Sequence, residues 1–352
     1  MNFTQARALF TQALVDVYRD ITPVKGFGRS FFRDELNLTK LAKIEVERGF
    51  EFVAVDVLRN SDGNANQASR STEKIIEPPF YSEWLPLNSL DAYDRVLANP
   101  SETFELAALT REAGQKTAKL RDKIERAYEL QTWQVFKNGI VSLSKVAQID
   151  YKRKALSMVD LGGGDYWTVS GSNPIADLEK GCNFLRTVGK SGGGVVNAIM
   201  GSKALDAFLN NAKVKEIGEL RRIDLITIKL EQRNALGASL YGAVTVGAFT
   251  VMIWTYPEFY DVVEGGNVVS KPYVDVNDVI MLPEAPRFVM SYNQVPQLLG
   301  DTYVPQTGAY LLREEIDVQK KAHKMYVESA GVAIPTAVDQ IYTIKATNVS
   351  NS

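Results

Sequence analysis

Cysteine and histidine are almost absent from this 352-residue sequence, which has one of each. The single cysteine, Cys182, excludes a disulfide within the chain and every metal site built from a cysteine cluster. The single histidine, His323, lies in a basic stretch at residues 320–324, whereas catalytic triads and histidine metal pairs need additional partners. We therefore predict that the chain is not an enzyme and that it has no catalytic residue, no metal site and no cofactor.

The sequence also lacks a long apolar run and an excess of charge of either sign. Its most apolar run, residues 248–254, is far too short to cross a bilayer, and no initial segment has the composition of a secretion signal. The formal net charge of −2 gives no overall basic field that would attract nucleic acid or an anionic membrane. The composition is typical of a globular protein with one large or two medium domains, made in a reducing cytoplasm and without a membrane partner.

Residues 102–138 predict one very long helix. Ser101 is suited to cap its start, acidic residues follow in the first turn, and Gly139 supplies a stop. Apolar and small residues recur at alternating steps of three and four and so share one helix face: Leu106, Leu109, Ala113, Thr117, Leu120, Ile124, Ala127, Gln131 and Val135. At about 1.5 Å per residue the helix would extend roughly 55 Å. A coiled coil is one interpretation; a spine across a flat, elongated subunit is the other, and the remaining features favour the spine.

A long two-stranded hairpin is predicted before this helix. Residues 43–57 alternate polar and apolar side chains, residues 59–72 contain no apolar side chain larger than alanine, and residues 74–77 resume an extended pattern. Pro78, Pro79 and Pro86 keep the second half out of any central sheet position. Because a lone hairpin is marginally stable in water, we expect it to lie on a neighbouring subunit.

The first 40 residues have the pattern of an exchanged arm. Apolar side chains between residues 3 and 20 share one helix face, and Gly26 and Gly28 form a flexible link before the pair Phe31 and Phe32. Residues 173–304 instead alternate predicted helices and strands, which is typical of a compact α/β domain. Asn173 and Pro174 open a helix that residues 189–194 end, strands are expected at residues 195–200, 223–230, within 241–256 and at 279–282, and Gly265 and Gly266 mark a turn. A final strand at residues 341–346 would return to a sheet that begins near Ser142.

Two glycine-rich stretches invite an enzyme interpretation. Residues 159–165 are similar to the nucleotide-binding loop of methyltransferases, but their glycines lead into Tyr166 and Trp167 rather than into a helix. Residues 189–191 have the ending of a phosphate loop, but they follow a predicted helix instead of preceding one. A methyltransferase that uses S-adenosylmethionine is therefore kept only as an alternative function.

The order of these features resembles the lambda-type major capsid proteins of tailed bacteriophages, the capsid protein E family. The resemblance runs nearly end to end and rests on short stretches in the family's order: residues 27–36 with Phe31 and Phe32, 38–40, 46–49, 132–139, 159–162 with Trp167, 195–197, 204–208, 241–242 and 303–305. Residues 256–271 and 291–294 depart from the family pattern.

The resemblance implies an α+β fold of the Hong Kong 97 type. It implies an N-terminal arm at residues 1–40, an extended loop at 41–86, a peripheral domain at 87–172 and 305–352 around a spine helix at 102–138, and an axial domain at 173–304. It also implies subunits that assemble as hexamers and pentamers into an icosahedral shell around double-stranded DNA, in the virion, after assembly in the host cytoplasm. A shell of the same fold that encloses an enzyme cargo, as in encapsulins, is a second alternative.

The implied partners are further copies of the chain, a separate scaffolding protein, a portal protein and DNA without sequence specificity, with a decoration protein as a further candidate. Residues expected at contacts between subunits lie in the arm and the hairpin: Phe31, Phe32, Arg48, Phe50, Phe52, Arg59, Arg70 and Lys74. Arg29, Arg33 and Lys40 are candidates to face DNA phosphates.

Overall fold

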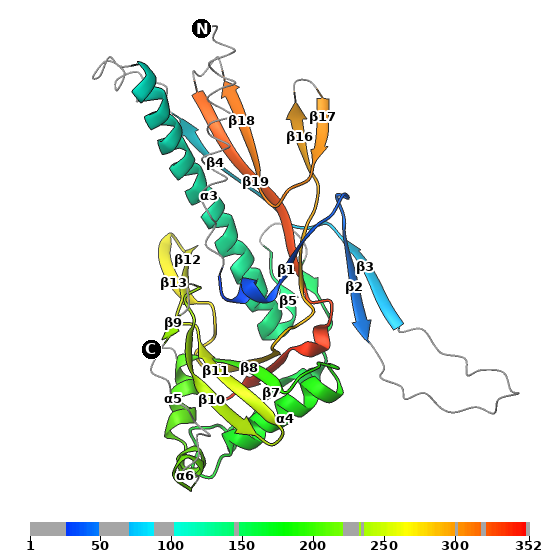
Figure 1. Ribbon diagram of the computed structural model, residues 1–352, viewed down its shortest axis with the longest axis vertical. Coiled ribbons are helices and arrows are strands. Elements are labelled where there is room, and N and C mark those ends of the chain that lie inside the picture. Colours follow the sequence, from blue (N-terminus) through cyan, green and yellow to red (C-terminus); the bar gives the residue numbers. More distant parts are fainter. Residues whose placement is uncertain are drawn as a thin grey trace, which may run out of the picture.

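The computed structural model describes residues 26–48, 70–87, 102–143, 148–220, 232–233, 236–299, 302–317 and 322–349. The helix predicted at residues 3–20, the hairpin tip and the strand expected near residues 223–230 lie outside these ranges. Figure 1 shows an elongated molecule in which a long helix and one sheet occupy one end and a second sheet with three helices occupies the other.

The long helix α3 spans Glu102–Asn138, the range predicted from the sequence. It ends at Gly139, whose φ of 70° is the left-handed conformation favoured by glycine and whose N–H donates to the Val135 carbonyl at 3.0 Å. Within residues 114–136 the buried face is wider than a coiled-coil seam and includes Ala118, Arg121, Glu125, Tyr128, Glu129, Thr132, Trp133 and Phe136 in addition to the predicted stripe. This part of α3 therefore packs into its own subunit.

A five-stranded sheet lies beside α3. Its strands are β1 (Arg33–Leu36), β15 (Val289–Tyr292), β19 (Ala322–Ile334), β18 (Leu311–Asp317) and β4 (Phe80–Leu87). The long β19 pairs with β4 and β18 along its first half and with β15 along its second half. The backbone of β19 approaches α3 so closely that a Cβ on Gly331 would lie 2.6 Å from the Tyr128 hydroxyl. Glycine is therefore required where sheet and helix meet.

The other end of the molecule contains a seven-stranded sheet in the order β7 (Met158–Asp160), β20 (Tyr342–Lys345), β14 (Asp278–Pro283), β8 (Val195–Met200), β11 (Phe249–Thr255), β10 (Ser239–Val246) and β9 (Gln232–Arg233). Helices α4 (Pro174–Thr187), α5 (Ser202–Asn210) and α6 (Ala212–Leu220) accompany it. The start of α4 follows from its sequence, because Asn173 accepts a hydrogen bond from the Ala176 N–H and Pro174 occupies the first turn. Leu178, Cys182 and Leu185 of α4 are buried in the core of this end.

Four two-stranded sheets complete the described part of the chain. They are β2 (Ala42–Arg48) with β3 (Arg70–Ile76), β5 (Ile140–Val141) with β6 (Ile149–Asp150), β12 (Phe259–Glu264) with β13 (Asn267–Pro272), and β16 (Val295–Leu299) with β17 (Thr302–Gln306). The β2–β3 pair, with Arg48 opposite Arg70, is the base of the hairpin expected at residues 41–86. The turn predicted at Gly265 and Gly266 joins β12 to β13, and both glycines have positive φ.

Each of the two large sheets combines strands from more than one of the sequence ranges expected for the domains. Strand β4, expected in the extended loop, pairs with β19, and its position at a sheet edge agrees with Pro86. Strand β15, expected in the axial range, also pairs with β19. Strands β7 and β20, expected in the peripheral range, lie in the seven-stranded sheet. The predicted return of the last strand to a sheet near Ser142 is therefore wrong, because β20 pairs with β14 and β7.

Candidate functional site

The glycine loop after β7 does not have the setting of a nucleotide site. Residues 161–172 form turns, and α4 begins at Pro174, so no helix opens directly from the loop. The Asp160 carboxylate accepts hydrogen bonds from the Tyr166 hydroxyl at 2.9 Å and from the Lys345 ammonium at 3.2 Å. Residues 189–191 end α4, since the Gly189 N–H donates to the Phe184 carbonyl, which agrees with their prediction as a helix stop.

Among the described residues, no cluster of three or more histidine, cysteine, aspartate or glutamate side chains is close enough to hold a metal ion. No helix in the same ranges is long and apolar enough to cross a membrane.

A buried carboxylate fixes the end of the predicted arm to α3. Glu129 accepts hydrogen bonds from the backbone N–H groups of Gly28 and Arg29, both at 2.8 Å, from Trp133 Nε1 at 2.7 Å and from the Tyr256 hydroxyl. Burial raises the pKa of Glu129, while these donors act in the opposite direction. One side chain thus satisfies four donors from three separate segments.

Gly26 and Gly28 permit this contact by close approach. A Cβ on Gly26 would lie 2.1 Å from the Glu129 carboxyl carbon, and one on Gly28 would lie 2.7 Å from Thr132 Oγ1. The interpretation of these glycines as a flexible link is therefore wrong, because the segment they flank is packed tightly against α3.

The structure also places three predicted arm residues inside the subunit. Phe32 is buried between Phe136 and Phe288, with ring centroids 5.6 and 5.2 Å away, and Phe31 packs on Phe136. Arg29 is 1% exposed and donates to the Phe32 carbonyl, to the Tyr292 hydroxyl at 2.9 Å and to Asp34. Phe32 thus belongs to the subunit's own core, Phe31 is partly buried against that core, and Arg29 cannot face DNA in this arrangement.

The remaining predicted residues have other surroundings. Arg33 is exposed, and exposed Lys40 pairs with Glu77 at 2.8 Å, so both are accessible to a partner. Arg48, Arg70 and Lys74 lie on the β2–β3 hairpin. Phe50, Phe52 and Arg59 lie outside the described residues.

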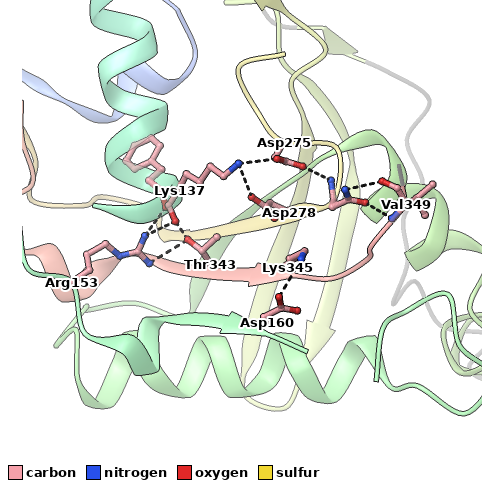
Figure 2. Close-up of polar contacts among 10 residues, drawn as sticks. Lys137, Arg153, Asp160, Asp275, Asp278, Thr343, Lys345 and Val349 are labelled. Carbon is pink, nitrogen blue, oxygen red and sulfur yellow. Dashed lines mark hydrogen bonds and ion pairs between the residues drawn. The ribbon is translucent and has the colours of Figure 1, made fainter. Parts of the chain in front are cut away.

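A second polar cluster, which sequence reasoning did not identify, joins α3 to the seven-stranded sheet (Figure 2). The buried Arg153 guanidinium donates to the carbonyls of Phe136 at 2.7 Å, Ser157 at 2.8 Å and Ile341 at 3.2 Å, and to Thr343 Oγ1 at 3.2 Å. It therefore caps the last turn of α3 and binds the backbone at the start of β20. Burial lowers the pKa of Arg153 to about 9, so the guanidinium is still charged at neutral pH.

The same junction contains two carboxylates that lie at different distances from one lysine. The Lys137 ammonium lies 2.8 Å from Asp275 Oδ2 but 3.9 Å from Asp278 Oδ2. Burial, together with the neighbouring Asp275 charge, raises the pKa of Asp278 to about 6. Partial burial acts in the same direction on Asp275, but the hydrogen bond from Lys137 opposes it, and the pKa of Asp275 is lowered. Asp278 therefore bears its charge at neutral pH at a cost to folding.

Replacing Asp278 with asparagine should stabilise the subunit at alkaline pH. Because the folded-state pKa of Asp278 is raised, its contribution to stability is fully present below the unfolded pKa near 4 and is lost as pH rises through about 6. The free energy of unfolding of Asp278→Asn should exceed that of the wild type by up to about 2 kcal/mol at pH 8 and by almost nothing at pH 4. Urea titrations of the unassembled subunit at both pH values measure this difference.

The exposed residue Asp206 provides the control. Asp206→Asn should change the free energy of unfolding by less than about 0.5 kcal/mol at both pH values. An Asp278→Asn variant that is less stable than the wild type at pH 8 would contradict the assignment of Asp278 as a strained carboxylate.

Apolar side chains are exposed on two separate surfaces. On β12–β13, the side chains of Phe259, Val263 and Val268 are 59%, 75% and 70% exposed. Around the base of the β2–β3 hairpin, another exposed set comprises Leu36, Leu38, Leu41, Ile75 and Phe80. Figure 1 shows β12–β13 on one side of α3 and β2–β3 on the other. Such surfaces are typical of sites that contact another protein.

Comparison with known proteins gives one family and a common fold. The family model described as phage major capsid protein E matches residues 11–346. A crystal structure assigned as the capsid protein of an Escherichia coli prophage has a TM-score of 0.62 and 13% identity, covering 99% of both chains. A phage-related protein from Bordetella bronchiseptica has a TM-score of 0.55 and 15% identity, covering 95% of this chain and 96% of that one. No curated protein sequence matches.

Proposed function

The chain belongs to the phage major capsid protein E family, and from this premise we propose that its copies assemble as hexamers and pentamers into an icosahedral shell around double-stranded DNA. A major capsid protein is a structural component of the virion shell, and a shell is built from many copies of its subunit. The observation that carries the proposal is the family match over residues 11–346.

The β2–β3 hairpin supports an assembly in which subunits overlap. Within the described residues its strands pair only with each other, and a two-stranded ribbon of this kind is marginal in water without a surface to cover it. We propose that a neighbouring subunit supplies this surface and that Arg48, Arg70 and Lys74, together with Phe50, Phe52 and Arg59 beyond the described part of the hairpin, contact that neighbour.

We propose a division into regions of the Hong Kong 97 type. We propose that the arm ends near residue 40, that the β2–β3 hairpin is the extended loop, that α3 with the five-stranded sheet forms the peripheral region, and that the seven-stranded sheet with α4 to α6 forms the axial region. The described pairings of β4, β7, β15 and β20 would then set the region boundaries, in place of continuous sequence ranges.

The remaining partners are proposed from the same family membership. A scaffolding protein and a portal protein would take part in assembly in the host cytoplasm, and a decoration protein is a further candidate. Arg33 and Lys40 are exposed and available for DNA phosphates, while the near-neutral chain would hold DNA without strong attraction.

Electron microscopy of the purified protein, expressed with and without its scaffolding protein, tests the proposal. We expect closed particles with icosahedral symmetry, and nuclease-protected double-stranded DNA in particles recovered from infected cells. A protein that stays monomeric under both expression conditions would overturn the proposal. Particles that protect a protein cargo but no DNA would instead support a compartment of the encapsulin type.

Shortening the hairpin should abolish assembly without unfolding the subunit. Because Arg48 and Arg70 are paired, residues 49–69 can be replaced by Asn-Gly, a two-residue turn suited to an antiparallel hairpin. The unassembled variant should unfold within about 0.5 kcal/mol of the wild type, since Ala42 and Ile76, the described hairpin residues that pack in the core, are retained. Particle yield by sedimentation should fall below detection, and normal particles would show that the tip is not needed between subunits.

A further inference from the structure

The β12–β13 hairpin has one face that nothing in the described part of the subunit covers. Phe259, Val263 and Val268 share this face, because the antiparallel register places Val263 opposite Val268 and Phe259 four residues before Val263. Asp261 lies between them and bonds only to the Ser270 hydroxyl, with no cation among the described residues paired to it. We call these residues the β12–β13 face.

The opposite face of the same hairpin is directed at the body of the subunit. The Tyr260 ring packs on Tyr273 with centroids 5.0 Å apart, and Tyr273 packs in turn on Tyr256 beside Trp133. The hairpin is therefore held in a fixed position with its apolar side outward.

A groove of about 440 Å³ lies on the other side of α3, where the β2–β3 hairpin leaves the five-stranded sheet. Pro78, Phe80 and Pro296 form apolar parts of its wall. The charged part of the lining consists of two ion pairs, Lys40 with Glu77 and Arg313 with Glu328. Phe80 is 55% exposed, and Leu38 and Leu41 flank Lys40 in the chain and are also exposed. We call this site the β4–β16 groove.

We propose that the β12–β13 face of one subunit docks into the β4–β16 groove of the next copy within a capsomer. This inference rests on the proposed function and adds to it a particular contact between named surfaces. The occupant of the groove is a second copy of this chain, and the contact is heterologous, since two different surfaces meet.

The positions of the two surfaces favour this arrangement over a contact between like surfaces. They lie on opposite sides of the long axis of one subunit (Figure 1), and a contact between different surfaces can continue from copy to copy until a ring closes. A contact of the β12–β13 face with itself would stop at a dimer.

The shape and the apolar side chains of the two surfaces agree with the same pairing. The exposed apolar side chains of the β12–β13 face would meet a concave surface with apolar walls. The cations of the groove, Lys40 and Arg313, are paired within it with Glu77 and Glu328, so apolar contact rather than charge supports the docking. The apolar side chains of both surfaces would leave water in the same step.

Crosslinking between two cysteine variants tests the contact. Val263→Cys and Phe80→Cys are co-expressed, and the assembled particles are treated with a short bismaleimide. The native Cys182 is buried, and burial raises the pKa of its thiol to about 12, so it should not react. We expect dimers linked between positions 263 and 80, at least ten-fold more abundant than in either variant alone.

Leu156→Cys provides the matched control, because Leu156 is 74% exposed and lies on neither surface. Its mixture with Val263→Cys should give only the background level of dimers. Two results would overturn this inference but leave the proposed shell intact. One is particles that lack the 263–80 link, and the other is a 263–263 link in Val263→Cys alone. A wild-type protein that forms no particles would overturn both.

A charge variant keeps the inference testable if a cysteine variant assembles poorly. The double variant Val263→Asp, Val268→Lys replaces two exposed apolar side chains with a cross-strand pair of opposite charge and should leave the circular dichroism spectrum and thermal midpoint of the free subunit unchanged. Its particle yield should fall at least ten-fold. A normal yield would show that the β12–β13 face is not an assembly contact.

Discussion

Arg153→Ala should destabilise the unassembled subunit by about 4 kcal/mol or more, one of the largest effects of any single substitution in this chain. The guanidinium is the donor to the carbonyls of Ser157 and Ile341, and it shares the Phe136 carbonyl with Thr343 Oγ1. Each buried acceptor left without a donor costs roughly 1–3 kcal/mol. Urea denaturation followed by tryptophan fluorescence measures the loss.

Arg153→Ala should also reduce the cooperativity of unfolding. Arg153 bonds at once to the end of α3 and to the start of β20, so without it the two ends of the molecule lose a shared polar contact. Calorimetry of Arg153→Ala should therefore give a broader or divided transition. Arg153→Lys should recover less than half of the lost stability, because an ammonium cannot reach carbonyls on both sides.

Lys152 serves as the control for this experiment. It is the neighbour of Arg153 in sequence, its side chain is 81% exposed, and it pairs with Asp150 at the surface. Lys152→Ala should change the free energy of unfolding by less than about 0.5 kcal/mol. A loss of under about 1 kcal/mol in Arg153→Ala would show that the observed hydrogen bonds do not hold the junction.

Elements with strong local signals could be predicted from the sequence. The start and stop of α3, the Asn173-Pro174 opening of α4 and the Gly265–Gly266 turn all depend on residues within a few positions of the feature. Strands β8, β10, β11 and β14 also follow the predicted apolar segments.

The arrangement of these elements could not be predicted in the same way. Strand β19 pairs with β18, which directly precedes it, but also with β15 and with the distant β4, and β20 enters the other sheet between β7 and β14. No local pattern specifies which strand pairs with which, because the register depends on burial in the finished sheet. For this reason the expected domain ranges divide strands that pair with each other.

The polar clusters were missed because their residues are ordinary in sequence. Glu129 lies in a charged helix where a carboxylate normally faces solvent, and Arg153 lies in the basic stretch 152–154. One sequence signal could have indicated Glu129. The two glycines on either side of Phe27 allow this backbone segment to approach a helix closely, and a glutamate on that helix is a suitable acceptor for the N–H groups of the segment. For Arg153 the sequence contains no comparable signal.

Glu129→Ala should release the segment Gly28–Phe31 from α3 and cost about 3–5 kcal/mol of stability. The substitution leaves four donors without their acceptor: two backbone N–H groups, the Trp133 indole and the Tyr256 hydroxyl. Hydrogen exchange should locate the damage, because the amides of Gly28 and Arg29 lose their carboxylate acceptor and should exchange at least ten-fold faster. Denaturant titration measures the accompanying loss of stability.

Glu129→Gln separates the acceptor role of this side chain from its size. Glutamine is nearly isosteric, but its NH₂ group must face either the Arg29 N–H or the Gly28 and Trp133 donors, so it should lose about half as much stability as alanine. Lys119→Ala, at an exposed position of α3, should stay within about 0.5 kcal/mol of the wild type and leave the exchange of Gly28 unchanged. A glutamine variant as stable as the wild type would show that only one oxygen of Glu129 is needed as an acceptor. The close approach of Gly26 and Gly28 to α3 would then be the main force that holds this segment, since those contacts do not depend on the carboxylate charge.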